Sequence, residues 1–140
     1  MTQGVVVLPL EGERYAIPTE RVRQIVASPV VTSIPTAPPT VRGVFNLRGQ
    51  IVPLLDTALL LGIATAVASA SRSTPYAAVV ETPHGDVGLT VSQMPWVAQL
   101  GPEVGTTDRP GTAGLHSVGS ELVVLIDPDV LLSPSRIGEG

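Results

Sequence analysis

The chain has 140 residues, of which 44% are hydrophobic, 14% are charged and 3% are aromatic, and its formal net charge is −4. All of its basic residues are arginines, and this weakly acidic balance excludes an electrostatic attraction to nucleic acid or to an anionic membrane. No apolar run is long enough for a spanning helix, so direct membrane insertion is not expected. The absence of cysteine excludes disulfides, thiolate catalysis and cysteine metal sites.

The composition predicts a β-rich domain with many turns. Val, Leu, Ile and Ala supply most of the apolar residues, and the chain has 14 glycines and 14 prolines. β-branched residues favour strands, and frequent turn residues keep those strands short. The start, Met1–Gly4, lacks the features of a signal peptide, and a sequence without cysteine fits the cytoplasm, which is the location we expect.

In chain order, the first elements predicted are two strands, Val5–Leu10 and Tyr15–Pro18, joined by a polar turn. A Pro/Thr-rich connection leads to a hairpin in which Val41–Leu47 returns as Gln50–Leu55. Asp56 then caps a short apolar helix that ends before Gly62.

Between the second strand and the hairpin, the sequence predicts a short helical turn. Thr19 is a suitable N-cap, and Val22, Ile25 and Val26 fall on one face at helical spacing. Gln24 points elsewhere and is expected to be exposed.

The same order of elements is predicted again in the second part of the chain. Strands are expected at Tyr76–Glu81 and Val87–Val91, and a hairpin joins Gly114–Val118 to Glu121–Ile126. Asp127 again opens a short apolar helix that ends at about Leu132.

The two parts are also similar in sequence. Gly43–Leu61 aligns without a gap with Gly114–Leu132, and six of the 19 pairs are identical. Val5–Leu8 aligns with Ala77–Val80 at an offset that differs by one residue. Two aligned blocks in the same order indicate an internal repeat.

The repeat predicts one domain, 1–140, made of two similar halves at roughly 1–62 and 75–135. Residues 63–74 are small, polar and of low complexity, and they are expected to form a flexible connection. About 60 residues bury too little surface to be secure alone, so the halves are expected to share a core. The fold class predicted is all-β with short helices, with two pseudo-repeated SH3-like barrels.

Several motifs resemble the CheW-like family over roughly residues 4–133. The most specific is a Gly-Val-x-Asn-Leu-Arg-Gly hairpin at Gly43–Gly49, followed by a strand that ends in Pro53-Leu54-Leu55-Asp56. Further matches are the Leu10–Ile25 pattern, the Pro38–Val44 lead-in, the Val87–Val91 strand and the Leu125–Asp127 strand. The sequence departs from the family at Thr57-Ala58, where Leu-Arg is usual after the aspartate.

The resemblance implies two intertwined five-stranded barrels and a non-enzymatic adaptor without a cofactor. It implies two partners, the regulatory domain of a CheA-type histidine kinase and the cytoplasmic tip of a chemoreceptor. An alternative is a CheW-like scaffold for a sensory pathway other than swimming, such as surface motility or gene regulation.

Six residues are candidates for partner binding. Arg48 lies at a hairpin tip, where its planar guanidinium could bind a partner carboxylate or could instead tie down its own hairpin. Asn46 belongs to the same turn, and Gly49 is expected to adopt a positive φ.

The other four candidates come from the equivalent segments of the two halves. By resemblance, Val22 and Gln24 in the first half, and Met94 and Val97 in the second, approach the receptor-binding groove. The alternative for the aliphatic members is that they belong to the core.

Two aromatic residues, Phe45 and Trp96, could anchor an interface or cover a barrel end. His84 and His116 have no further ligand residues clustered with them, so no metal site is predicted.

Two other classes of function have some support in the sequence. An aspartic-protease-like hydrolase would use the equivalent aspartates Asp56 and Asp127, but the second is followed by Pro128 and both are expected to cap helices. An SH3-like barrel could bind proline-rich peptides, but this chain is poor in the aromatic residues such grooves need.

Overall fold

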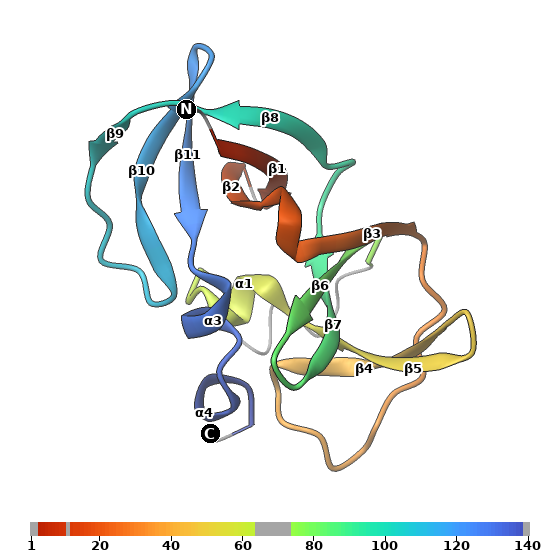
Figure 1. The fold of residues 1–140 in the computed structure, drawn as a ribbon. Coiled ribbons are helices and arrows are strands. Elements are labelled where there is room, and N and C mark those ends of the chain that lie inside the picture. The colour runs from red at the N-terminus through yellow and green to blue at the C-terminus, as the bar shows by residue number, and fades with distance from the viewer. Residues whose placement is uncertain (1–2, 11, 64–73, 139–140) are drawn as a thin grey trace.

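The computed structural model describes residues 3–10, 12–63 and 74–138, which form two β-sheets with short helices (Figure 1). The elements of the first repeat are β1 (Gln3–Leu10), β2 (Glu13–Pro18), η1 (Thr19–Arg21), β3 (Val22–Ala27), β4 (Val41–Leu47), β5 (Gln50–Leu55) and α1 (Thr57–Leu60). Those of the second are β6 (Tyr76–Thr82), β7 (Gly85–Val91), β8 (Trp96–Leu100), β9 (Glu103–Gly105), β10 (Thr112–Val118), β11 (Glu121–Ile126), α3 (Pro128–Leu131) and α4 (Pro134–Ile137).

Each sheet takes strands from both halves of the sequence. The six-stranded sheet has the order β8-β1-β2-β11-β10-β9, and the five-stranded sheet has the order β3-β6-β7-β5-β4. The first hairpin of each repeat therefore pairs with the last hairpin of the other. The halves 1–62 and 75–135 describe the repeat along the chain, and the strands of the two halves are interleaved in space.

The repeat is visible in the strand pairing. When β1 to β5 are exchanged for β6, β7, β8, β10 and β11, the order of the five-stranded sheet becomes that of the six-stranded sheet without β9. The parallel contacts agree, because Leu54 lies opposite Gly88 and Leu125 lies opposite Ala16 at equivalent positions. We call residues at equivalent positions of the two repeats counterparts. The predicted all-β fold with two pseudo-repeated barrels is thus confirmed, with β9 as an added edge strand.

One predicted element is wrong. A helical turn was expected over Val22, Ile25 and Val26, but these residues lie on strand β3, after a 3-10 turn that involves Thr19–Arg21 only. Thr19 is not the cap, since Pro18 precedes the turn and makes no side-chain cap. These residues pair with β6, and a bulge near the start of β3 shifts the side-chain alternation, so that Val22 and Ile25 pack against the same cluster at a spacing that resembled a helix. Val26 packs against a different cluster.

Buried hydrophobic residues form three clusters, one shared by the two sheets and one within each sheet. The shared cluster combines Leu8 and Ile17 of one sheet with Val80 and Leu89 of the other, all fully buried. Tyr15 is also buried there and donates a hydrogen bond of 2.6 Å from its hydroxyl to Glu13. Burial, followed by this bond, raises the pKa of Tyr15 above its usual value. A shared core explains why neither half need be stable alone.

Both predicted capping aspartates are confirmed. The side chain of Asp56 accepts a hydrogen bond of 3.0 Å from the Leu59 amide at the start of α1. The side chain of Asp127 accepts from the Asp129 and Val130 amides at the start of α3. Of the predicted connection 63–74, residues 64–73 lie outside the described residues. Over the described ranges, no helix has the length and apolar character needed to cross a membrane.

Candidate partner-binding surfaces

The β4–β5 hairpin ends in a two-residue turn that displays an arginine. Arg48 and Gly49 both have positive φ, 53° and 88°, as a type I′ turn requires. The Asn46 side chain accepts a hydrogen bond of 2.9 Å from the Gly49 amide, so Asn46 stabilises the turn. Arg48 is exposed, and its guanidinium makes no hydrogen bond or ion pair with any residue described. The turn therefore presents an unpaired cation to solvent.

The two candidates on β3 are only partly accessible. Val22 is half-buried and packs with Ile25 against the shared core, which favours a structural role for both. Gln24 was expected to be exposed but is also half-buried, opposite Val79 of β6.

The counterpart segment in the second repeat is much more open. Met94 is 58% exposed, Trp96 is 40% exposed and Val97 is 68% exposed. Trp96 lies opposite Val7, at the position that Gln24 occupies opposite Val79. Trp96 and Val97 are consecutive residues of the edge strand β8, so their side chains point to opposite faces of the six-stranded sheet, and Met94 precedes the strand. We call these three exposed residues the β8 edge residues.

The six candidate residues therefore lie in three places. Arg48 and Asn46 belong to the β4–β5 hairpin, Val22 and Gln24 to the opposite edge of the same sheet, and Met94 and Val97 to the second sheet.

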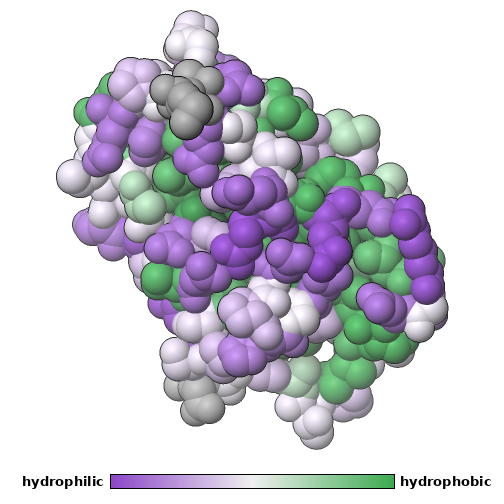
Figure 2. Space-filling model, in the orientation of Figure 1, coloured by the Kyte–Doolittle hydropathy of each residue, from purple (hydrophilic) through white to green (hydrophobic). Residues whose placement is uncertain are grey.

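An apolar hollow was missed by the sequence analysis. Its volume is about 540 Å³, and it lies between the edge strands β3 and β4 of the five-stranded sheet. It is lined by Val26, Ala27, Ser28, Pro29, Val30, Thr32, Val44, Phe45, Asn46 and Ile51. Figure 2 shows hydrophobic surface gathered over this part of the molecule, at the lower right. The exposure of Val30 (85%) and Ile51 (65%) depends on how the strands end, which residue patterns alone do not give.

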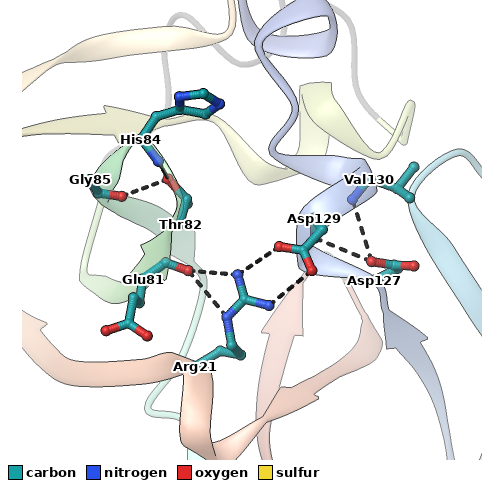
Figure 3. A network of polar contacts seen from close by, with 8 residues as sticks. All are labelled: Arg21, Glu81, Thr82, His84, Gly85, Asp127, Asp129 and Val130. Atoms are coloured by element: carbon teal, nitrogen blue, oxygen red, sulfur yellow. Dashed lines mark hydrogen bonds and ion pairs between the residues drawn. The ribbon is translucent and has the colours of Figure 1, made fainter.

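A charged network follows the seam between the sheets (Figure 3). Arg21 donates to the Glu81 carbonyl oxygen and forms a two-point contact with the Asp129 carboxylate, with a shortest distance of 2.8 Å to each. The hydrogen bond with Asp129 raises the pKa of Arg21, and the same bond lowers the pKa of Asp129. Asp129 is well exposed, so solvent screens the pair and its contribution to stability is small. The seam is a polar surface held by these contacts.

The geometry gives no support for catalysis by the two equivalent aspartates. The carboxylate of Asp56 is buried and both of its oxygens are used, one by the Leu59 amide and the other by Arg42 at 2.9 Å. Asp127 caps α3, and within the described part of the chain the two carboxylates share no hydrogen bond. The aspartates thus have the capping role that the sequence predicted.

The two candidate aromatic residues and the two histidines differ in how far they are buried. Phe45 is buried in the core beside Gly88, so it is not an interface anchor, whereas Trp96 is partly exposed. His116 is half-buried, and its Nδ1 lies 3.0 Å from the Gly101 carbonyl oxygen. His84 lies in the exposed β6–β7 turn. Among residues 3–10, 12–63 and 74–138, no group of His, Asp or Glu side chains could hold a metal ion.

Comparisons with known proteins agree with this fold over nearly the whole chain. Residues 4–135 match the sequence model of the CheW-like domain. The Chemotaxis protein CheW of Klebsiella aerogenes is 30% identical over 143 aligned positions, covering 96% of this chain and 84% of that protein. The Chemotaxis protein CheW of Thermotoga maritima is 20% identical, covering 94% of this chain and 88% of that protein.

A solved structure shows the same architecture. The scaffolding protein TtCheW from Thermoanaerobacter tengcongensis superimposes with a TM-score of 0.71 and 24% sequence identity, over 90% of this chain and 89% of that one. Together with the match over residues 4–135, the interleaved sheets and the paired hairpins, this shows that the chain belongs to the CheW-like domain family.

Proposed function

We propose that this chain is a cytoplasmic, non-enzymatic adaptor that couples chemoreceptors to a CheA-type histidine kinase. The observation that carries the proposal is an exposed, unpaired Arg48 beside a hydrophobic hollow, on a fold shared with proteins named for chemotaxis and for scaffolding. The hollow offers apolar area and the guanidinium offers orientation, which is the combination typical of a protein interface.

The β4–β5 hairpin and the hollow form the surface proposed for the kinase regulatory domain. Arg48 carries a planar fork of donors that suits a partner carboxylate, and none of the residues that line the hollow is charged. By resemblance, the regulatory domain is itself CheW-like, so barrel would dock on barrel. A pseudo-symmetric chain of such contacts would extend an assembly.

The surface proposed for the receptor tip is the sheet edge that carries the β8 edge residues Met94, Trp96 and Val97. Trp96 and Val97 belong to the edge strand, Met94 precedes it, and all three are exposed, so they can pack against an apolar ridge of a helical hairpin. Val22 and Gln24, which the resemblance also assigns to receptor binding, are half-buried and would contribute less area. Separate surfaces allow the two partners to be bound together.

Each surface is modest, so micromolar affinity is expected, with signalling strength supplied by many copies in an array. A second candidate function, a scaffold for surface motility or gene regulation, would use the same surfaces with a different receptor and kinase.

The test is the affinity of the purified chain for the regulatory domain of a CheA kinase from its own cell, measured by titration calorimetry. We expect Arg48→Glu to weaken binding at least tenfold, because it places a carboxylate where a carboxylate is to be bound. Arg48→Asn is the matched control, since Asn tolerates the left-handed turn conformation and removes the charge without reversing it. We expect Asn to weaken binding less than Glu, with unchanged circular dichroism for both. Equal affinity of all three proteins would exclude Arg48 from the interface.

A further inference from the structure

The two repeats differ in how the strand before the hairpin turn is covered. In the second repeat, the Gly101 amide donates to the Ser117 carbonyl oxygen at 2.7 Å, and the Ser117 amide donates to the Pro102 carbonyl oxygen at 3.2 Å. These bonds close the barrel along the outer edge of β10. The counterpart of Ser117 is Asn46, on the outer edge of β4.

The first repeat begins the same closure and then stops. Thr32 and Val44 exchange two backbone hydrogen bonds, of 2.8 and 2.9 Å. Outward and inward groups alternate along an antiparallel strand, so the backbone N–H and C=O of Asn46 point outward like those of Val44. Between residues 28 and 47, all of which are described, no backbone hydrogen bond reaches Asn46 from this edge. An open edge therefore remains.

The closing contact of the second repeat is made by a glycine. A Cβ added to Gly101 would lie 2.5 Å from the Ser117 carbonyl oxygen, so only glycine allows the two backbones to meet. In the first repeat, continuing the Thr32–Val44 register by two residues brings Val30 opposite Asn46. Val30 carries a Cβ where Gly101 has none, and it is left 85% exposed. The chain also bends away from β3 at Ser28, whose φ is 47°.

The open edge faces the hollow described above. Val26 and Ala27 of β3 lie among its lining residues with Val44, Asn46 and Ile51. Two unpaired backbone groups in an apolar surround are the features that bind an extended peptide by strand addition.

We infer that the edge of β4 at Asn46 binds an extended segment of the partner, which completes this barrel as residues 101–102 complete the other. The second repeat indicates the chemistry of the segment: a glycine opposite Asn46, in an otherwise apolar stretch. The exposed cation of Arg48, two residues further along the hairpin, selects an acidic residue at the adjoining end of the segment. This inference rests on the proposed function, in which the segment belongs to the CheA regulatory domain.

Hydrogen exchange of the Asn46 amide tests the inference directly. In the free protein this amide should exchange rapidly, whereas the Phe45 amide, which points toward β5, should be protected and serves as the internal control. Addition of the CheA regulatory domain should slow exchange at Asn46 at least tenfold. Binding of the kinase domain without protection of Asn46 would overturn strand addition and leave the proposed function intact. If the wild-type chain does not bind the CheA regulatory domain, the proposed function is wrong, and so is the assignment of the bound segment to that domain.

Two variants at one position sharpen the test. Val30→Gly removes the Cβ, and we expect this to let the chain close its own barrel as Gly101 does. We expect the Asn46 amide of this variant to be protected in the free protein, and its affinity for the kinase domain to be about tenfold below that of Val30→Ala. Val30→Ala keeps a Cβ and should leave the edge open, with rapid exchange at Asn46. Rapid exchange in both variants would show that Val30 does not hold the edge open.

Discussion

At the scale of single residues, Asp56 and Asp127 occupy equivalent positions but are expected to contribute differently to stability. Each caps a short helix that directly follows the last strand of its own repeat. Only Asp56 is buried, and it also forms an ion pair of 2.9 Å with Arg42, whose side chain is 17% exposed. The counterpart of Arg42 is Ala113, so Asp127 has no such partner at that position. Removing one member of a buried pair leaves the other charge without compensation.

We therefore predict that Asp56→Ala lowers the free energy of unfolding by about 3–5 kcal/mol. Asp127→Ala is the matched control and should cost about 1 kcal/mol, the usual value of a lost N-cap. Urea denaturation followed by circular dichroism measures both. Equal losses would show that the Arg42–Asp56 pair adds nothing beyond the cap.

Residues of this kind could be predicted from the sequence in part. An aspartate before a short apolar run is enough to predict a cap, and Asn46 and Gly49 were enough to predict the hairpin turn. The burial of Asp56 could not be predicted, because Arg42 reaches it across the sheet rather than along a helix.

At the scale of elements, Gly88 allows β7 to pass under the ring of Phe45. A Cβ on Gly88 would lie 2.8 Å from the Phe45 ring and 3.3 Å from Leu54. At the counterpart position, Ala16 is fully buried, and the residue matching Phe45 is His116. The large ring and the missing side chain therefore compensate for each other within one packing layer.

The expected consequence is that Gly88→Ala destabilises the protein by about 1–3 kcal/mol, the usual cost of overpacking. In a protein that already carries Phe45→Leu, Gly88→Ala should cost less unfolding free energy than it does in the wild type. The measurement is a double-mutant cycle of unfolding free energies. Additive losses would mean that the two side chains do not compete for the same space.

The wrong prediction of a helical turn at β3 also has its cause at the level of elements. Val22, Ile25 and Val26 have the spacing of a helical face, but β3 is a strand whose bulge brings Val22 and Ile25 against one cluster, while Val26 packs against another. Whether a bulge is present depends on pairing with β6, more than 50 residues away, which local periodicity does not contain.

At the scale of the whole molecule, the internal repeat predicted two similar units but not how their strands are shared. Val5–Leu8 and Ala77–Val80 align because each begins a repeat, yet β1 and β6 lie in different sheets. Pairing between strands leaves little trace in one sequence, since any apolar strand can lie beside another. The open edge at Asn46 was missed for the same reason, because it arises from a contact that one repeat makes and the other does not.

The proposed adaptor links a receptor to a kinase, and binding of both partners at once can be measured by sedimentation. Vesicles carrying the chemoreceptor from the same cell are sedimented with its CheA kinase, with and without the purified chain. The account predicts that the chain increases the kinase recovered with the vesicles several-fold, and that Arg48→Glu reduces this gain while still sedimenting with the receptor. A chain that leaves kinase recovery unchanged, and itself stays in the supernatant, would contradict the adaptor function while leaving the fold as described.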